Sequence, residues 1–445
     1  MFDFDLSGKN KYYTLYLKIR EEILRGKVTA GEKLPSKRAL AENLGVSVIT
    51  VQRALEQLLA EGYIVSKERS GYFVGDVTPT KTQKKKDYIQ KAKESENYKI
   101  DFVKGSAPAS LFPFATWARL IRAVLLDCGE HLLERVPCDG DGELKREIAS
   151  YLYRARGIEV EPRYIVIGAG AEYLYGLLVQ LIGRDKLIAV ENPGYKLISA
   201  TYKMNGATCL PIPVTDTGIS LEGVENSRAH IVHISPSHQF PTGAVMGIPQ
   251  RQRLVDWAES SGGYIVEDDY DSEFRLTGKP LQSTYSLLPD RVIYINTFSK
   301  SLAPSMRLGY MILPPKLYEK YLKLFSSSAN TVSLFEQKTL AKMLQGGFFE
   351  RHISRLKTHY RYEREAILKF IGEKFPDCIP RDTGSGLHMT AYFPNAESDE
   401  EIKVKAAELG IKIKCLTDYL VSPLEGMEKT AVINYSGITT EDLKI

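Results

Sequence analysis

The chain has 445 residues, an apolar fraction of 43% and a net charge of +4, enough for more than one domain and a sizeable core. No window reaches 18 apolar residues, and the acidic start has no apolar run, so neither a membrane helix nor a secretory signal is expected. Five scattered cysteines without a Cys-x-x-Cys pair favour a reduced cytoplasm over a disulfide framework or a zinc site.

The first 75 residues predict three helices and a hairpin. Apolar residues recur at helical spacing over residues 12–24. Ser36 and Ser47 are good N-cap residues for two further helices, which a glycine turn separates. Residues 63–65 and 72–74 flank a charged tip and form a small hairpin. This order of elements is typical of a winged helix-turn-helix, an α+β domain that binds double-stranded DNA.

The segment LPSKRALAENLGVSVITVQRALEQLLAEGYI closely resembles the signature of the GntR family of transcription regulators. In this geometry the third helix enters the major groove and the second crosses the DNA backbone. Thr50 and Gln52 are the candidates for base contacts, although the family commonly has arginines where Val48 and Gln52 stand. A solvated charged face is the alternative for the lysines. The full set of DNA-contact candidates is Lys37, Arg38, Ser47, Thr50, Gln52, Arg53, Lys67, Arg69 and Gly71.

Residues 76–103 have almost no large aliphatic side chains and contain three consecutive lysines at 84–86. They predict a flexible basic linker, with at most a short helix at 88–93. An extended stretch of roughly 25 residues reaches about 80 Å, which is enough for the DNA-binding domain to contact a partner subunit. Contact of the lysines with the DNA backbone is the alternative to a plain linker.

Residues 104–445 alternate between strand-like and helix-like runs, which predicts an α/β domain with a mostly parallel sheet. The expected strands are 164–167, 187–190, 231–234, 264–266 and 292–295. A long helical run follows from residue 334 to 370. Strands at 384–393, 411–414 and 430–435 predict a small C-terminal subdomain.

Lys300 lies just after the last of the parallel strands, in the segment VIYINTFSKSLAPSMRLGY (residues 292–310). Ser299 and Ser301 flank it, Pro304 prevents a regular helix, and Arg307 follows. An amine in these surroundings forms a Schiff base with an aldehyde, while Ser299 and Arg307 hold a phosphate, as pyridoxal 5'-phosphate (PLP) requires. For an isolated lysine, a surface loop would be the preferred interpretation. The segment resembles the Schiff-base segment of fold-type I aminotransferases, and most closely that of the MocR-type branch of the GntR regulators.

This resemblance implies further contacts with PLP. Asp268 pairs with the pyridine nitrogen, Tyr270 bonds the phenolic oxygen, and Tyr195 stacks on the ring. The glycine-rich turn before Ala171 and Glu172 exposes backbone amides at a helix N-terminus, where a phosphate is favoured. A magnesium site in the acidic run 267–273 is the alternative to the role of Asp268. His238 lies in SPSHQFPTG, where ordinary aminotransferases have Asn-Pro-x-Gly; it is a cofactor contact, an effector contact or a core residue.

The ligand of the large domain is the least determined feature. Aminotransferases carry an arginine that clamps the substrate carboxylate where this chain has Val432, and GABA-responsive regulators carry one where it has Leu197. PLP itself is therefore preferred as the effector, with control of vitamin B6 synthesis genes as the implied consequence. An amino compound, such as a D-amino acid or dipeptide held by Arg381, Arg355 or His238, is the alternative.

The resemblance thus predicts a PLP-dependent regulator that binds operators with repeated half-sites as a homodimer. Physiological transaminase turnover is not expected. A working aminotransferase with a DNA-binding head is one alternative. A dimerisation scaffold with a vestigial cofactor site is the other.

Overall fold

A computed structural model of the protein describes residues 4, 10–78, 98–105, 108–276, 278 and 281–443. The chain divides into two compact units, Met1–Ser95 and Glu96–Ile445.

The lysine run and the short helix predicted for the linker lie outside the described residues. The linker was predicted to extend to residue 103, whereas strand β3 (Ile100–Asp101) pairs with β14 (Ile411–Lys412) in the second unit. Ile100 and Phe102 are buried there, because apolar side chains in a polar stretch pack on the nearest core.

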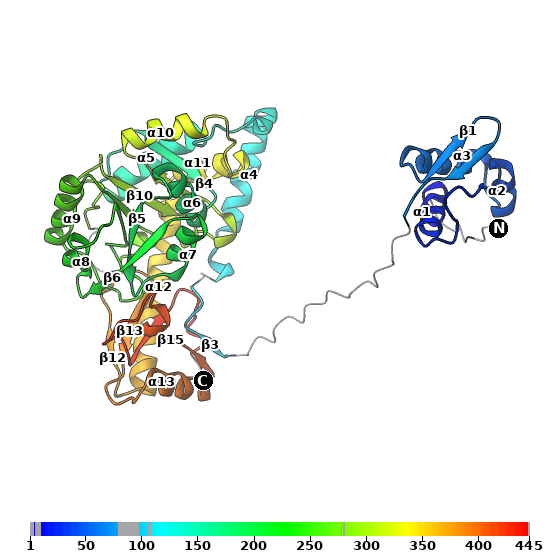
Figure 1. Ribbon diagram of the computed structural model, residues 1–445. Helices are drawn as coiled ribbons and strands as arrows, with labels where there is room; N and C mark the ends of the chain where they lie inside the picture. Colours follow the sequence, from blue (N-terminus) through cyan, green and yellow to red (C-terminus); the bar gives the residue numbers. More distant parts are fainter. Residues whose placement is uncertain are drawn as a thin grey trace. The chain divides into compact units, whose positions relative to one another are not determined.

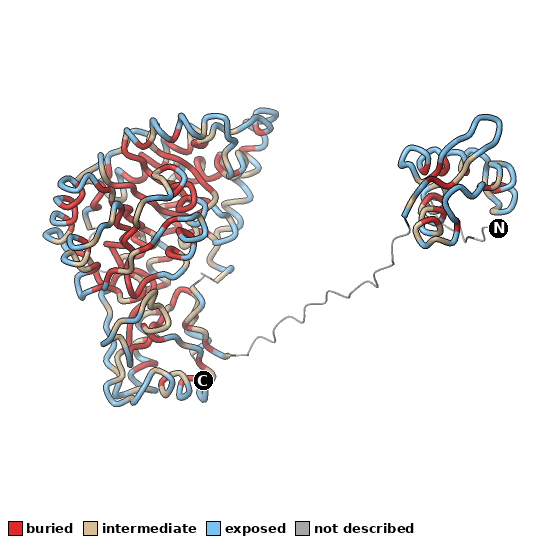
Figure 2. The backbone as a smooth tube through the Cα atoms, viewed as in Figure 1, coloured by how far each residue is buried: buried red, intermediate tan, exposed pale blue. Residues whose placement is uncertain are grey.

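The first unit contains α1 (Lys11–Leu24), α2 (Lys37–Leu44) and α3 (Val48–Ala60), followed by the antiparallel hairpin of β1 (Ile64–Lys67) and β2 (Gly71–Val74) (Figure 1). The hydroxyl of Ser36 accepts a hydrogen bond from the Ala39 N–H and caps α2. Apolar side chains of all three helices form one buried core, which includes Leu15, Ile19, Leu40, Val51 and Leu55. Figure 2 shows buried stretches of backbone inside this unit. The winged helix-turn-helix expected from the sequence is confirmed.

The second unit is built around an eight-stranded sheet (Figure 1). All strands are parallel except β11 and β7. The C-terminal ends of β4, β5, β8, β9 and β10 therefore share one edge, the usual ligand edge of an α/β sheet. The strand order is β4 (Ile165–Gly168), β11 (Gly309–Ile312), β10 (Val292–Thr297), β9 (Tyr264–Asp268), β8 (Ile231–Ile234), β5 (Leu187–Asn192), β6 (Thr208–Thr215) and β7 (Gly218–Ile219).

Helices cover both faces of this sheet. In β10, Ile293 and Ile295 belong to the core on the face of α6 (Ala171–Ile182), α7 (Lys196–Met204) and α10 (Pro315–Phe325). Val292 and Tyr294 belong to the core on the opposite face, as the alternation of a strand requires. The helices of that second face are α5 (Gly142–Arg156), α8 (Leu221–Glu225), α9 (Ile248–Ser261), α11 (Leu334–Gln345) and α12 (Phe348–Lys374), with α4 (Phe114–Cys128) packed beside α11.

The C-terminal part forms a smaller layer beside the large sheet (Figure 1). Its antiparallel sheet has the order β12 (Ile379–Arg381), β13 (His388–Tyr392), β16 (Thr430–Asn434) and β15 (Lys414–Cys415), with α13 (Asp399–Glu408) nearby. Short 3₁₀ turns connect several elements: η1 (Ala109–Leu111), η2 (Gly129–Leu133), η3 (Pro162–Tyr164), η4 (Ser272–Phe274), η5 (Pro304–Met306) and η6 (Leu416–Tyr419).

One expectation about helices was wrong. The helical run predicted from residue 334 to 370 is interrupted between α11 and α12. Gly346 and Gly347 occupy the break, and Gly347 has a φ of 65°, in the left-handed region that glycine adopts most readily. Among the described residues, no helix combines the length and apolar character needed to cross a membrane.

Candidate functional site

Lys300 lies in the loop that connects β10 to β11. The Phe298 N–H donates to the Leu308 carbonyl at 3.0 Å, so the two ends of the loop stay together. Pro304 begins the turn η5, and Arg307 leaves it with a positive φ of 49°. The carbonyl of Ser301 lies 2.8 Å from Nε2 of the buried His352 in α12. The loop is therefore fixed at its ends and again beside the lysine.

Lys300 as a whole is half-buried, and its amine, at the inner end of the side chain, donates a hydrogen bond to the Gly105 carbonyl. Burial lowers its pKa below that of an ordinary lysine, although the nearby Asp271 carboxylate opposes this effect. A lower pKa increases the fraction of neutral amine, the form that attacks a carbonyl carbon. Gly105 has no room for a side chain, because a Cβ there would lie 3.0 Å from Lys300 Nζ and 2.8 Å from Asn434 Nδ2.

Asp268 ends strand β9 and is buried. It accepts a hydrogen bond from the hydroxyl of Tyr175 in α6. Nε2 of His233 lies 3.5 Å from the same carboxylate oxygen, and Nδ1 of His233 lies 2.7 Å from the hydroxyl of Tyr202. Tyr175, His233 and Tyr202 were not predicted as site residues. The one available signal was a histidine within the otherwise apolar strand β8.

Two other carboxylates of the acidic run, those of Glu267 and Asp269, have partners of their own. Glu267 accepts from the Ser283 hydroxyl at 2.6 Å and from the Tyr285 N–H at 2.8 Å. Asp269 lies 2.9 Å from a guanidinium nitrogen of the buried Arg156. Because neighbouring side chains of a strand point to opposite faces, these acids and Asp268 do not converge on one ion. The contacts do not support the magnesium alternative.

A cradle for an anion lies where α6 begins. Ala171 and Glu172 occupy its first turn, whose N–H groups have no partner within the helix. A Cβ on Gly170, which has a φ of 84°, would lie 3.3 Å from the guanidinium carbon of Arg307. Arg307 also faces Glu172 at 3.7 Å. The N-terminus of the helix and the guanidinium therefore favour a negative group at the same place. Ser299 is half-buried in the Lys300 loop.

Tyr195 is the N-cap residue immediately before α7, and its side chain is exposed. Its ring meets Phe240 edge-on at 5.9 Å, and Phe240 in turn contacts Tyr419 at 5.0 Å. The resemblance to aminotransferases implies that Phe240 stands where those enzymes have an asparagine.

His238, Asp271 and His388 form a buried polar cluster. Nδ1 of His238 lies 3.0 Å from an Asp271 oxygen, and the two imidazole rings are 4.1 Å apart. Potential metal-ligating atoms of all three lie within 4.8 Å of one another. Nε2 of each histidine is buried without a hydrogen-bond partner. The Tyr270 hydroxyl donates to the His238 carbonyl at 3.0 Å.

The surroundings of His388 disfavour the protonated form of its ring. Burial, the neighbouring His238 and the Lys300 amine together hold the pKa of His388 well below its usual value. The effect of Lys300 indicates that the cluster belongs to the surroundings of the lysine.

The resemblance to aminotransferases implies that those enzymes have an arginine at the position of Val432, which binds a substrate carboxylate. The cluster of His238, Asp271 and His388 contains no arginine that could take its place. Val432 is buried in β16, opposite Thr390 of β13. The two predicted replacements, Arg355 and Arg381, are exposed, and the guanidinium of Arg381 lies over the ring of Tyr392.

Three of the predicted DNA-contact residues, Ser47, Thr50 and Gln52, form hydrogen bonds within α3 or at its start. The Ser47 hydroxyl accepts a hydrogen bond from the Thr50 N–H at 3.1 Å and lies 2.8 Å from the Thr50 hydroxyl. Ser47 is therefore an N-cap residue first. Nε2 of Gln52 donates to Glu56 at 2.7 Å, a bond that a base contact would have to replace. Arg53 is exposed on the same helix.

Ile49 was not predicted as a DNA-contact residue. It lies in the first turn of α3 with 68% of its surface exposed, next to the exposed Val48. Two apolar side chains at the N-terminal end of a recognition helix suit contact with thymine methyl groups in the major groove.

The remaining candidates lie along α2 and the wing. Arg38 is exposed, and Lys37 is half-buried with its amine over the ring of Tyr72. Lys67 extends over Phe73, and Arg69 occupies the wing tip with a φ of 58°. Gly71 follows with a φ of 104°, a conformation that suits glycine. The arginines are thus free to meet phosphate.

Comparison with known proteins identifies both units. The profile described as "Bacterial regulatory proteins, gntR family" matches residues 11–74, and "Aminotransferase class I and II" matches residues 111–384. The uncharacterized HTH-type regulator YdeL of Bacillus subtilis is 37% identical over 97% of this chain and 94% of its own. The probable rhizopine catabolism regulatory protein MocR of Rhizobium meliloti is 31% identical over 97% and 91%. This chain belongs to the MocR-type subfamily of the GntR transcription regulators.

Two further similarities agree with this assignment of the MocR-type regulator. The pyridoxine biosynthesis regulator PdxR of Corynebacterium glutamicum is 29% identical over 90% of this chain and 87% of its own. The multiple substrate aminotransferase of Thermococcus profundus has the same fold, with a TM-score of 0.70 and 23% identity over 79% of this chain and 89% of that one. The expected fold-type I architecture of the MocR-type regulator is confirmed.

Proposed function

We propose that this MocR-type regulator binds PLP in its second unit and changes its affinity for operator DNA in response. The observation that carries the proposal is the position of Lys300 in one loop with Arg307. Their amine and guanidinium lie close to Asp271 and to the beginning of α6, respectively. In PLP sites the protein supplies an amine for the aldehyde, a cradle for the phosphate and a carboxylate for the ring, and the proposed ring carboxylate is Asp268.

Each residue has one role in the proposed site. Lys300 would hold PLP through its amine, the Asp268 carboxylate would pair with the ring nitrogen, and Tyr195 would contact the ring. Arg307, Ser299 and the amides of Ala171 and Glu172 hold the phosphate. Tyr270 and His238 lie on the side of the phenolic oxygen. When bound, PLP supplies an aldehyde that reacts with amines and a ring that withdraws electrons.

We propose that DNA binding resides in the first unit and depends strongly on salt. Arg38→Ala and Arg69→Ala each remove one phosphate contact, so affinity falls on every operator variant and the salt slope decreases by about 1. Gln52→Ala and Thr50→Ala change the preference between operators instead, by about 1 to 3 kcal/mol at the contacted base pair. Fluorescence anisotropy over a salt series on single-base operator variants measures both effects.

Arg25→Ala is the matched control, because Arg25 ends α1 and its guanidinium pairs with Glu21 at 2.6 Å. This variant should bind DNA like the wild type. Equal losses on all operators for Gln52→Ala would assign Gln52 to phosphate and contradict its role in base recognition.

We propose that the protein is a homodimer. Exposed apolar side chains gather on α4 and η2, where Leu126 is 75% and Leu133 is 79% exposed. Apolar groups concentrated in this way usually mark an interface. Sedimentation at micromolar concentration should give the mass of two chains, and Leu126→Glu with Leu133→Glu should give one. Val404→Glu on α13, another exposed apolar position, is the control that should stay dimeric. A wild-type monomer at this concentration would refute the proposal.

The preferred effector is PLP, because the buried cluster beside Lys300 has no arginine for a carboxylate. The name of PdxR refers to pyridoxine biosynthesis, which is consistent with control of vitamin B6 genes here. An amino compound remains the second candidate effector, with His238 as a contact. A ligand acts as a signal only when it binds the two states of a regulator differently.

A working aminotransferase is the second candidate function, since the fold is that of these enzymes. The absence of an arginine at Val432 argues against turnover of amino acids. Single-turnover absorbance measurements with alanine, glutamate and GABA test it. Conversion of PLP to its amine form within minutes would support the enzyme, whereas an unchanged spectrum supports the regulator.

A further inference from the structure

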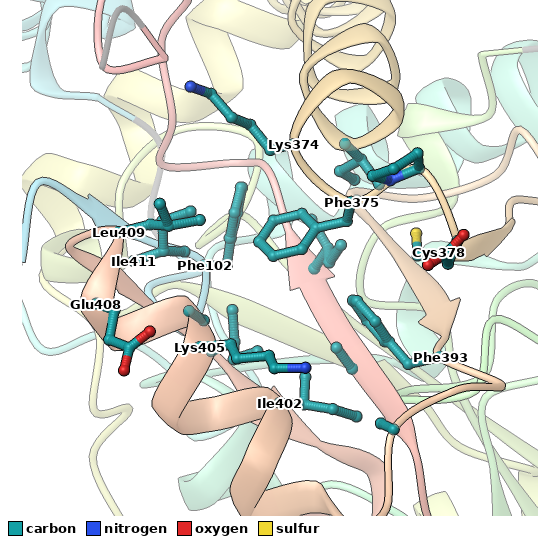
Figure 3. A pocket seen from close by; sticks show the side chains of 18 of the residues that line it. Phe102, Lys374, Phe375, Cys378, Phe393, Ile402, Lys405, Glu408, Leu409 and Ile411 are labelled. Carbon is teal, nitrogen blue, oxygen red and sulfur yellow. The ribbon is translucent and has the colours of Figure 1, made fainter.

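The second unit begins with a short segment that is tied to its C-terminal layer. Strand β3 pairs in parallel with β14, and the Phe102 N–H donates to the Lys412 carbonyl at 3.0 Å. The Asn434 N–H of β16 donates to the Phe102 carbonyl at 3.1 Å. Phe102 is buried, and its ring lies in an apolar groove that Ile411 and Phe375 also line (Figure 3). This stretch of chain is therefore held by backbone bonds and by packing.

The next residues form a turn that reaches the Lys300 loop. The side chain of Asp101 accepts from the Val103 N–H at 2.9 Å and from the Lys104 N–H at 3.2 Å. Beyond this turn, the Gly105 carbonyl accepts a hydrogen bond from the amine of Lys300, which is 195 residues away in the sequence. Along the chain, this segment is where the residues that follow the DNA-binding unit enter the second unit. Lys300 therefore holds the entry segment against the candidate PLP site.

The contact between Lys300 and Gly105 is close as well as polar. A Cβ on Gly105 would lie 3.0 Å from Lys300 Nζ and 2.8 Å from Asn434 Nδ2. A larger residue at this position would thus displace the amine. The contact depends on a glycine at position 105 and on a free amine at position 300.

The Lys300 amine cannot keep this hydrogen bond and also react with an aldehyde. A neutral amine that condenses with an aldehyde loses both of its hydrogens, which leave with the aldehyde oxygen as water. The nitrogen gains a double bond to carbon and carries at most one proton, taken up from solvent. That proton lies in the plane of the double bond, so its direction is set by the bound ring and not by Gly105. The Gly105 carbonyl then loses its donor.

We propose that the hydrogen bond between Lys300 and Gly105 is a latch, which holds residues 103–105 while the amine is free and releases them when PLP takes the amine. This inference rests on the proposed function, because it supplies the step between PLP binding and the DNA-binding unit. The latched and released states differ in their affinity for PLP, as a signal requires. Release alters the segment from which the chain leads back to the DNA-binding unit.

Hydrogen exchange of the full-length protein, followed by mass spectrometry, tests the latch directly. The amides of Val103 and Lys104 should be protected in the PLP-free wild type. PLP, or the change Lys300→Met, should speed their exchange about two- to tenfold, the effect of losing one ordinary hydrogen bond. In Lys300→Met, PLP should have no further effect on these amides.

Lys357→Met is the matched control, because Lys357 is a half-buried lysine of α12. It should exchange like the wild type, and the amides of β5 should be unchanged in every variant. Equal exchange of Val103 and Lys104 in PLP-free wild type and PLP-free Lys300→Met would overturn the proposal.

Operator affinity separates the latch from the proposed function. PLP-free Lys300→Met should bind operator DNA as PLP-loaded wild type does. Gly105→Ala keeps the lysine but displaces its amine, so it should shift the PLP-free protein in the same direction, and it replaces Lys300→Met if that variant does not fold.

The possible failures are distinguishable. If the wild type responds to PLP while both PLP-free variants keep the affinity of PLP-free wild type, the latch is contradicted and the proposed function stands. If PLP leaves the wild-type affinity unchanged, the proposed function fails. The exchange rates of Val103 and Lys104 then still decide whether Lys300 holds this segment.

Discussion

Replacing Lys300 with alanine should abolish the visible absorption band of PLP bound as an imine, and also the product that borohydride traps. The lysine amine has a pKa lowered by burial, and it lies near the Asp271 carboxylate at the ligand edge of the sheet. The fold should survive, because Lys300 is only half-buried and its loop is held by backbone bonds at Phe298 and Leu308. Absorbance spectra and melting curves of the purified variant measure both expectations.

Lys357→Ala is the matched control. Lys357 is a half-buried lysine of α12 whose pKa is also lowered by burial. Its replacement should leave the band and the trapped product unchanged. The same imine absorption in the Lys300→Ala variant would show that another lysine carries PLP, and the assignment of Lys300 would be wrong.

The second large effect is expected for Asp268→Asn. This change keeps the shape of the side chain and removes the charge that would pair with a protonated pyridine nitrogen. Hydrogen bonds to charged groups contribute about 1.5 to 3 kcal/mol, so PLP affinity should fall about 10- to 150-fold. Fluorescence titration of the apo-protein with PLP gives the two dissociation constants.

Tyr175→Phe separates the charge of Asp268 from its orientation. The variant loses the hydroxyl that donates to Asp268 but keeps the carboxylate. Its PLP affinity should therefore fall less than that of Asp268→Asn. Equal PLP affinity in wild type and Asp268→Asn would mean that the carboxylate does not face the ring.

Local sequence patterns determine much of this fold. Ser36 and Ser47 correctly predict where α2 and α3 begin, because N-capping depends only on neighbouring residues. Lys300 and Asp268 follow recognisable strands, so their common edge follows from a parallel sheet. The break between α11 and α12 was missed because Gly346 and Gly347 lie within an otherwise continuous helical pattern.

The features that were not predicted depend on contacts between residues far apart in the sequence. Tyr175 and Tyr202 reach Asp268 and His233 only because α6 and α7 lie on the same face of the sheet, which no local pattern shows. The pairing of β3 with β14 brings Ile100 beside Ile411, although the two residues are far apart in the sequence of the second unit. Predictions from local patterns cannot supply such pairings, since many alternatives bury similar surface.

The central claim is that PLP itself changes DNA binding, and titration of the apo-protein on its own operator tests it most directly. Protein freed of PLP is mixed with labelled operator at fixed salt, and affinity and hydrodynamic size are followed as PLP is added. We expect PLP to change the operator affinity of the wild type and to leave that of Lys300→Ala unchanged. If PLP alters neither affinity nor size while an amine changes both in the PLP-loaded protein, the effector is the amine and the claim is contradicted.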